Sequence, residues 1–182
     1  MPNYIAREFA RRIGRTEEEA FLIGNGVNKP TGVLTTAQTG VTTAAQALIT
    51  FDEVIELYHS LREPYRRTAT FIMNDSTVKI LRKLKDSSGQ FLWQPSIKEG
   101  TPDTILNRPV KTSSFMPTAA AGKQAIAFGD FSYVWIADRQ GRVFRRLNEL
   151  FAQNGQVGFV ASQRVDGKQV LAEAIKVLVM KA

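Results

Sequence analysis

The residue types that most often carry out chemistry in proteins are scarce in this sequence of 182 residues, which has no cysteine and a single histidine, His59. The lack of cysteine excludes disulfides, thiolate metal sites and cysteine nucleophiles. One histidine cannot form a two-histidine metal site. A serine–histidine–carboxylate triad through His59 lacks a supporting nucleophile elbow of the Gly-x-Ser-x-Gly type. We therefore expect no catalytic residue, no metal and no cofactor, and a protein that is not an enzyme.

Three other motifs resemble functional sites but fail on their spacing. Gly24-Asn25-Gly26 begins like a dinucleotide-binding fingerprint, but Lys29 stands where the third glycine should be, and a helix rather than a strand is expected before it. Residues 26–31 contain a lysine but lack the Gly-Lys-Ser/Thr ending of a phosphate-binding loop. Glu17-Glu18-Glu19 would point about 100° apart on a helix, which predicts a solvated face rather than a metal site. Trp93 and Trp135 are expected to be core or interface anchors.

The net charge of +7 is concentrated in one segment, residues 62–85. Seven cations there face two carboxylates, Glu63 and Asp75, so the segment has a net charge of +5. Such a field attracts polyanions such as nucleic acid. The alternative is a solvated helix face followed by a loop, which the lack of interleaved aromatic residues favours. The candidate residues for contact with a polyanion or a subunit are Arg62, Arg66, Arg67, Lys79, Arg82, Lys83 and Lys85.

The four-residue spacing of Ile5, Phe9 and Ile13 predicts a helix over residues 3–22. These three side chains need an apolar partner and are the candidate helix interface. We expect the rest of the chain to cover them poorly, because the only obvious local partner is a hairpin near the C-terminus. No apolar run reaches the roughly 18 residues of a membrane-spanning helix, so no membrane partner is expected.

The following residues alternate between extended segments and capped helices. Residues 31–36 and 39–43 are rich in threonine and valine and are predicted to be extended. Thr50 and Glu53 have the spacing of a capping box, which predicts a helix that Pro64 ends. A buried strand is expected over residues 69–73. Asn74 is then expected to cap a helix that aligns Val78, Leu81 and Leu84.

The second half of the chain reads as β-rich. Residues 90–107 are expected to be loop, because they contain Pro95, Gly100 and Pro102. Strands are predicted over residues 109–113, 125–128 and 133–137, and a turn at Arg139-Gln140-Gly141 is predicted to lead into a further strand over 143–147. Asp166-Gly167 predicts a two-residue hairpin turn between residues 157–164 and 168–179.

Three blocks of sequence resemble a known family. The first is Glu19-Ala20-Phe21-Leu22 with Gly24-Asn25-Gly26 and Pro30-Thr31-Gly32-Val33-Leu34. The second is Phe71-Ile72-Met73-Asn74, followed by Leu81 to Asp86 and Gly89-Gln90-Phe91-Leu92. The third is Leu106 to Val110, followed by Ala127-Phe128-Gly129-Asp130. In this order, over residues 17–130, the blocks resemble the major capsid proteins of tailed bacteriophages of the Hong Kong 97 type.

The resemblance implies an α+β chain with the Hong Kong 97-type capsid fold, consisting of the axial domain and part of the peripheral domain. Residues 1–24 would be the end of the long spine helix of the peripheral domain. Residues 25–130 would be the axial domain, and residues 131–182 a β-rich return to the peripheral domain.

The function implied is that of a structural protein, the major capsid (head) subunit of a tailed double-stranded DNA phage or prophage. Such subunits form an icosahedral shell by self-assembly. The implied location is the virion, and the host bacterial cytoplasm before assembly. The partners implied are other copies of the chain, which form pentamers and hexamers in the intact family protein. Scaffold, portal and packaged DNA are further candidate partners.

Family members carry an N-terminal arm, an extended loop and the first part of the spine helix before the point where Met1 stands here. The resemblance therefore implies an N-terminally truncated chain, either an expressed fragment or the product of a truncated prophage gene. Because the missing segments make many inter-subunit contacts in the family, we expect small oligomers rather than closed shells. No cross-linking residue is carried over.

A different class of function stays open, that of a basic nucleic-acid-binding protein that contacts phosphates through residues 62–85. No recognition helix or single-strand-binding motif supports this alternative. A hydrolase is a third alternative, and it is disfavoured because no catalytic site is found.

Overall fold

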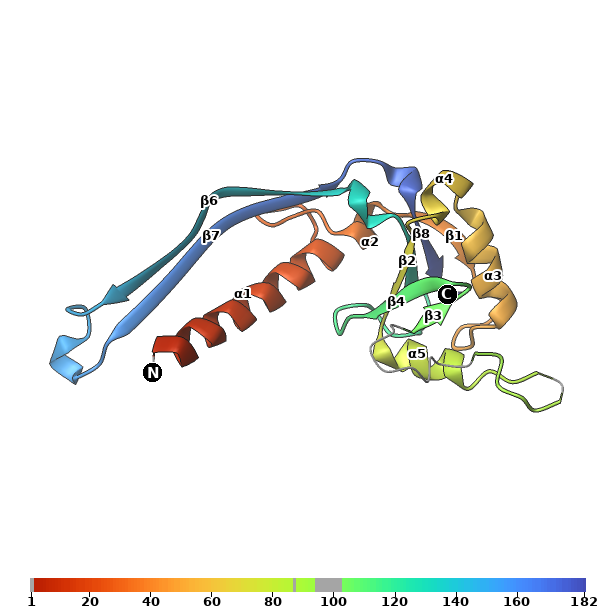
Figure 1. Ribbon diagram of the computed structural model, residues 1–182, viewed down its shortest axis with the longest axis horizontal. Helices are drawn as coiled ribbons and strands as arrows, with labels where there is room; N and C mark the ends of the chain where they lie inside the picture. The colour runs from red at the N-terminus through yellow and green to blue at the C-terminus, as the bar shows by residue number, and fades with distance from the viewer. Residues whose placement is uncertain (1, 87, 94–102) are drawn as a thin grey trace.

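An elongated arm projects from a domain built on a mixed β-sheet (Figure 1). The arm consists of helix α1 (Pro2–Ile23) and an antiparallel ribbon of β6 (Val134–Leu147) and β7 (Gly158–Gln169). The remaining strands and helices form the second part, which we call the sheet domain. Together they make an α+β chain, as the sequence predicted.

The computed structural model describes residues 2–86, 88–93 and 103–182. Among these residues, no helix has the length and apolar character that a membrane span requires.

The sheet domain contains six strands in the order β1-β8-β5-β2-β4-β3. Pairing is parallel for β1 with β8 and for β2 with β4, and antiparallel for the other neighbours. The central strand β5 is buried along almost all of its length, as expected for a strand covered on both faces. The strands are β1 (Gln38–Thr42), β2 (Thr70–Met73), β3 (Thr104–Ile105), β4 (Arg108–Thr112), β5 (Gln124–Gly129) and β8 (Ile175–Val179).

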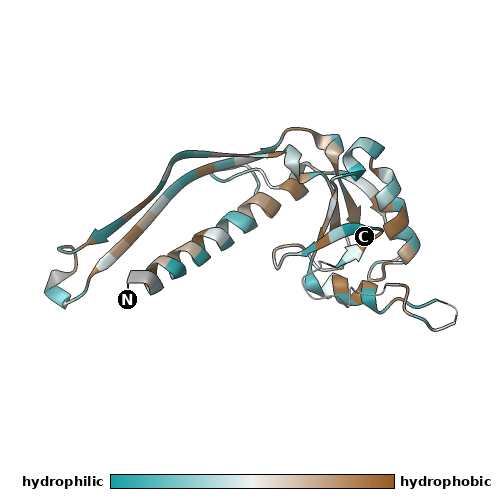
Figure 2. Cartoon of the chain, in the orientation of Figure 1, coloured by the Kyte–Doolittle hydropathy of each residue, from teal (hydrophilic) through white to brown (hydrophobic). Residues whose placement is uncertain are grey.

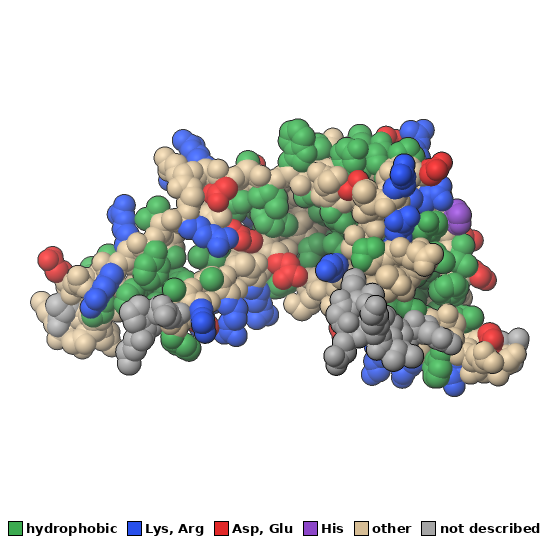
Figure 3. Space-filling model, viewed as in Figure 1, with side chains coloured by type: hydrophobic (Ala, Val, Ile, Leu, Met, Phe, Trp, Pro, Cys, Tyr) green, Lys and Arg blue, Asp and Glu red, His purple; other side chains and the backbone are tan. Residues whose placement is uncertain are grey.

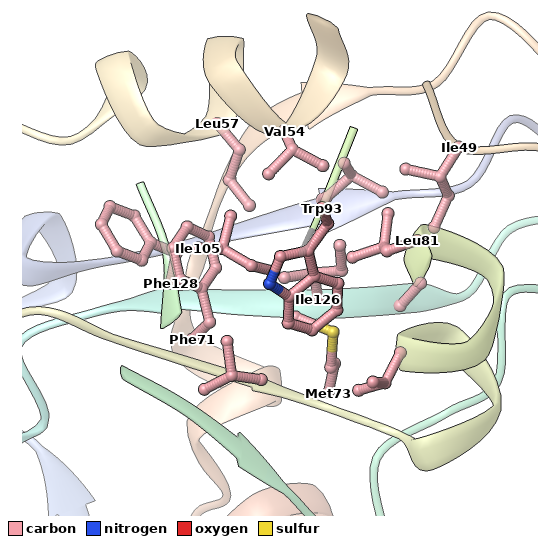
Figure 4. Packing of buried hydrophobic residues seen from close by; sticks show 14 of the residues in the cluster. Ile49, Val54, Leu57, Phe71, Met73, Leu81, Trp93, Ile105, Ile126 and Phe128 are labelled. Carbon is pink, nitrogen blue, oxygen red and sulfur yellow. The ribbon is translucent and has the colours of Figure 1, made fainter. Parts of the chain in front are cut away.

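Helices α3 (Phe51–Ser60) and α5 (Asp75–Arg82) contribute to the main core on one face of this sheet (Figure 4). At its centre, Phe71 of β2 and Phe128 of β5 stack with their ring centroids 4.2 Å apart. Trp93 closes the cluster, and its indole Nε1 donates a hydrogen bond of 2.9 Å to the carbonyl of Thr104. The tryptophan is therefore a core anchor with its polar atom satisfied.

Both predicted helix starts are confirmed. Thr50 and Glu53 form a reciprocal capping box at the start of α3, and the Asn74 side chain accepts a hydrogen bond from the Ser76 backbone at the start of α5. The predicted end of α3 is wrong, since the helix stops at Ser60 and Pro64 lies in the first turn of the next helix, α4 (Glu63–Arg66). Proline is tolerated there because the first backbone N–H groups of a helix have no intrahelical partner.

The opposite face of the sheet joins the arm to the sheet domain. Leu22, near the end of α1, is buried in a second cluster with Ala127 of β5 and Val177 of β8. Because alternate residues of a strand point to opposite faces, β5 supplies Ile126 and Phe128 to the main core and Ala127 to this junction. The sheet is therefore apolar on both sides, and one side holds the base of the arm.

Within the arm, α1 runs beside the ribbon (Figure 1), and side chains of the two meet at several points. The rings of Phe9 and Phe144 meet edge to face with centroids 5.4 Å apart. Arg142 of β6 forms an ion pair of 3.1 Å with Glu17. Nearer the sheet domain, β7 approaches the helix so closely that a Cβ on Gly167 would lie 2.9 Å from the ring of Phe21.

The predicted hairpin turn at Asp166-Gly167 is wrong. Neither residue has a positive φ, and β7 runs straight through both, with Gly167 opposite Ile136 of β6. The glycine serves the close approach of the helix instead of a turn. The predicted strand 168–179 is accordingly divided: its first two residues end β7, and its last five form β8 in the sheet domain.

The turn predicted at Arg139-Gln140-Gly141 is a bulge within one long strand. Gln140 and Gly141 do have positive φ, of 67° and 64°, as the turn signal required. The pairing nevertheless continues from Arg139 opposite Arg164 to Val143 opposite Ser162, so residues 140–142 face only Gln163. The two predicted strands on either side are therefore one strand, because the shared partner β7 aligns them.

Two further expectations fail. Residues 33–36, predicted to be extended, form the short helix α2 (Val33–Thr36), in which the Thr36 hydroxyl donates to Gln169 over 2.8 Å. This tertiary contact and the burial of Val33 and Leu34 override local β propensity. In the predicted loop 90–107, Thr104–Ile105 pairs with β4 as strand β3, and residues 94–102 lie outside the described residues. The other predicted strands agree with β1, β2, β4 and β5.

Three one-turn 3₁₀ helices complete the described elements. They are η1 (Phe131–Tyr133) before β6, η2 (Ala152–Asn154) at the far end of the ribbon and η3 (Ala172–Ala174) before β8. The predicted domain boundary at residue 131 separates β8 from the sheet domain, whereas β8 pairs with β1 and β5 within it.

A pair of glycine substitutions tests how closely the helix approaches the ribbon. We expect Gly167→Ala to lower the free energy of unfolding by about 1–3 kcal/mol, because the new methyl group would overlap the Phe21 ring. Gly14→Ala is the matched control, since a Cβ there meets nothing within 4 Å and alanine is the better helix former by up to about 1 kcal/mol. Urea unfolding measures both changes, and equal effects of the two substitutions would contradict the described packing.

A second substitution tests the contact between Phe9 and Phe144. Such an aromatic pair contributes about 0.5–1.5 kcal/mol, so we expect Phe144→Ala to speed amide hydrogen exchange across residues 4–13 roughly two- to tenfold. Val160→Ala is the control, because Val160 lies on the ribbon face that points away from the helix. Unchanged exchange in the Phe144 variant would mean that the ribbon does not hold this half of the helix.

Candidate assembly interface

The residues considered for catalysis lie far apart or have structural partners. His59 is exposed near the end of α3, where its Nδ1 atom lies 3.2 Å from the guanidinium of Arg66. Glu17 pairs with Arg142, and Glu18 accepts a 2.6 Å hydrogen bond from Ser113, so these two carboxylates diverge as the helical geometry predicted. Within the described part of the chain, no group of three or more His, Asp and Glu residues could hold a metal ion.

The seven cations of the basic segment do not form one patch. Arg62, Arg66 and Arg67 lie around α4, whereas Lys79, Arg82, Lys83 and Lys85 lie on or just after α5. Strand β2 runs between these two places, which are at opposite corners of the sheet domain (Figure 1). Figure 3 shows blue side chains gathered separately near both corners. Close spacing in sequence has therefore not produced close spacing on the surface.

Several of these cations are also engaged within the chain. Arg66 stacks on Tyr58 at 5.4 Å, and the Lys85 ammonium lies 4.8 Å from the ring centroid of Phe91. Arg82 lies over Trp93 and forms an ion pair with Asp103. The aromatic partners Tyr58, Phe91 and Trp93 all lie outside residues 62–85, so they could not be recognised within the basic segment itself. Of the other four, Arg62 pairs with Glu173 over 3.3 Å, and Arg67, Lys79 and Lys83 are exposed.

The predicted helix interface is partly covered. Ile5, Phe9 and Ile13 are all half-buried, and the ribbon supplies Phe144 as the contact of Phe9. On the neighbouring face of the helix, Arg11 and Arg12 each donate a hydrogen bond of 2.9 Å to Glu8. These two hydrogen bonds lower the pKa of the Glu8 carboxyl. Ile5, Phe9 and Ile13 thus have a partner in their own chain, but part of each side chain stays exposed.

Most of the exposed large apolar residues of the described chain lie in the ribbon or directly beside it. They extend from the base of β6 to the far end of the arm, where β6 connects to β7, and Figure 2 shows brown and teal segments interspersed along both strands. The most exposed are Trp135 and Leu150, each 67% accessible. The full set in and beside the ribbon is Trp135, Ile136, Val143, Phe144, Leu150, Phe151, Val157, Val160 and Val170.

The ribbon has one face toward α1 and one face away from it. In β7 the odd-numbered residues from Phe159 to Gln169 are buried or half-buried, and the even-numbered residues from Val160 to Lys168 are exposed. By the pairing register, Phe144 lies on the helix side and Arg139, Val143 and Arg145 lie on the outer side. The bulge inserts two extra residues, an even number, so the alternation is the same on both sides of it.

A hollow of about 500 Å³ lies at the junction of the arm and the sheet domain. Its walls are the C-terminal half of α1, the start of β6 and the sheet face at β2 and β4. The main apolar lining residues are Phe21, Leu22, Val33, Ile72, Phe131, Val134 and Ile136.

Sequence reasoning missed the ribbon as an exposed apolar surface. The odd–even alternation of residues 158–169 was an available signal, since it is the period of a half-buried strand. Gln140-Gly141 and Asp166-Gly167 concealed this alternation, because each was interpreted as a turn that would end a strand. The apolar residues Leu150 and Phe151 lie outside any predicted strand and carried no sequence signal.

The comparisons with known proteins agree on one family. Residues 1–180 match the model of the phage capsid family. The capsid chain of an empty GTA particle shares 35% sequence identity with a TM-score of 0.88, over all of this chain and 67% of that chain. The capsid chain of the native GTA particle gives the same identity and TM-score, over all of this chain and 66% of that chain. This chain thus spans about two thirds of the length of these relatives.

More distant structures share the fold alone. A chain from Microbacterium phage Oxtober96 has a TM-score of 0.72 at 15% identity, over all of this chain and 66% of that chain. No curated protein matches the sequence. The family match over nearly all residues and the GTA capsid similarity lead to the same conclusion: the chain belongs to the phage capsid family and has the Hong Kong 97-type fold.

Proposed function

We propose that this chain is a major capsid subunit, copies of which pack into the icosahedral shell of a tailed double-stranded DNA phage or a prophage-derived particle. The proposal gives it a structural role without catalysis and places it in the virion, with the host cytoplasm as its location before assembly. Family membership and the 35% identity to GTA capsid chains support it. The observation on which it depends is the exposed apolar surface of the arm.

Among the described residues, none covers the apolar side chains at the far end of the arm. Leu150, Phe151 and Val157 lie in the connection between β6 and β7, at the end of the molecule opposite the sheet domain (Figure 1). Burying a leucine side chain is worth about 1.5–3 kcal/mol, so these residues favour contact with another molecule. A projecting arm with an apolar end suits contact between copies, since each arm can reach a neighbour's surface.

The two parts of the chain would then have different neighbours. We assign the sheet domain, residues 25–130 together with β8, to the axial domain near the symmetry axes, where pentamers and hexamers close. Helix α1 and the ribbon belong to the peripheral domain, which would contact adjacent rings. Head-to-tail interfaces of this kind close into rings when the rotation between copies permits. Scaffold and portal proteins are further proposed partners, as is packaged DNA.

Substitution at the end of the arm tests this proposal. We expect Leu150→Asp to weaken association between copies roughly tenfold or more, because it places a charge on an exposed leucine that the proposed contact would bury. The matched control is Leu48→Asp, since Leu48 is also exposed, at 54%, but lies in the sheet domain before α3. Sedimentation velocity over a concentration series measures the association.

Circular dichroism checks that both variants remain folded. A Leu150 variant that associates as strongly as the unaltered chain would show that the end of the arm is not an assembly surface. An unaltered chain that stays monomeric at all concentrations would contradict the self-association that the proposal requires.

A further inference from the structure

Three arginines converge on the outer face of the ribbon at the bulge. Arg139, Arg145 and Arg164 line a shallow hollow of about 380 Å³ together with Val143, Val160 and polar residues. All three side chains are exposed, and none has a hydrogen-bond or ion-pair partner among the described residues. The hollow contains no carboxylate among its lining residues. The hollow itself is therefore lined by three positive charges and no carboxylate, and Asp166 is the one carboxylate beside it on the outer face of the paired ribbon.

The pairing of the strands makes this arrangement unfavourable for the isolated chain. Arg139 and Arg164 are directly opposite each other in register, and like charges in that position destabilise a ribbon. The two nearest carboxylates in sequence form no ion pair with these arginines, although Asp166 lies on the same outer face. Asp138 faces the helix side and accepts a 3.1 Å hydrogen bond from Gln163, and Asp166 accepts from the backbone N–H of Gly167 over 2.8 Å. An external anion would relieve the repulsion.

The bulge separates Arg142 from the three arginines of the outer face. It directs Arg142 toward the helix, where its guanidinium bonds to Gln163 and Glu17. Four arginines lie next to the bulge. Arg142 forms its ion pair on the helix side, and Arg139, Arg145 and Arg164 remain on the outer side. The same row continues toward the base of the arm with Lys168, which is exposed and opposite Trp135.

We propose that this outer face binds the phosphate backbone of duplex DNA. The identity of the polyanion rests on the proposed capsid function, in which DNA is the packaged molecule. Arginine side chains pair with phosphate oxygens through charge-assisted hydrogen bonds and are over-represented at phosphate sites. The basic segment 62–85 is the weaker candidate, because Arg62, Arg66, Arg82 and Lys85 there already have partners in the chain.

The composition of the face favours duplex DNA over two other anionic macromolecules. Single-stranded nucleic acid needs successive aromatic residues for base stacking, and Trp135 is the one aromatic residue on the outer face of the paired ribbon. An acidic protein segment would be expected to meet an apolar centre with charges at the rim. Here the arginines surround Gln140, Ser162 and Gln163, and only two valines border the hollow.

The test measures binding of a fluorescent 30-base-pair duplex by anisotropy across a salt series. One variant carries Arg139→Gln, Arg145→Gln and Arg164→Gln, and the matched control carries Lys79→Gln, Lys83→Gln and Lys85→Gln, so both lose three positive charges. The slope of log K against log salt changes by about 0.9 for each phosphate contact. We expect the arginine variant to lose about 2–3 units of slope, and the lysine variant to lose less than about 1.

The thermal midpoint and sedimentation of the same proteins separate this proposal from the capsid function. We expect the arginine variant to be at least as thermally stable as the unaltered chain, because the repulsion between Arg139 and Arg164 is removed. We expect its self-association to be unchanged in the absence of DNA. A variant that associates normally but does not bind DNA therefore supports the inference independently of assembly.

Four outcomes would overturn the proposal. The unaltered chain could fail to bind the duplex, or both variants could lose the same slope, which would indicate net charge alone. The lysine variant could be the one that loses binding, which would place the site in the basic segment. Finally, the arginine variant could retain DNA binding but lose binding of polyglutamate measured in parallel, which would indicate an acidic protein partner.

Discussion

The close approach of α1 to β7 at Gly167 holds the helix and the ribbon together at the base of the arm. At this point a Cβ on residue 167 would lie 2.9 Å from the ring of Phe21. The next residue of the helix, Leu22, lies in the second cluster of the sheet domain. One short stretch of helix therefore touches both the ribbon and the sheet. The direction of the arm is set by packing at its base, while the far end of the ribbon has no support from the sheet domain.

This arrangement explains why the arm is apolar where it is exposed. The two-stranded ribbon has two faces, and among the described residues one helix covers one of them. The outer face keeps exposed valines, a tryptophan and arginines, a composition typical of contact surfaces. The sheet domain differs, since its central strand β5 is covered on both faces and needs no neighbour for its core. The sheet domain thus contains the main buried core, and the ribbon contains exposed surface that partners can contact.

The sequence predicted the features that depend on local chemistry. The spacing of Ile5, Phe9 and Ile13 gave α1, and Thr50, Glu53 and Asn74 gave the starts of two helices. The failures share a cause: Asp166-Gly167 and Gln140-Gly141 have the composition of turns, but their conformations are decided by partners distant in sequence. Likewise, the separation of the basic residues by β2 and their aromatic contacts arise only when the strands pair, so no window of sequence contains them.

The bulge in β6 has a consequence for how this protein can vary in length. Three residues of β6 oppose one residue of β7, so the excess is two, and the strand regains its facing pattern beyond Gly141. Losing two of residues 140–142 would leave a regular ladder in which Phe144 still lies opposite Ala161. Losing one would leave a bulge with a single extra residue, in which the same pairs on either side also persist. The bulge is therefore the point on the ribbon where a change of chain length can be absorbed without moving the paired residues around it.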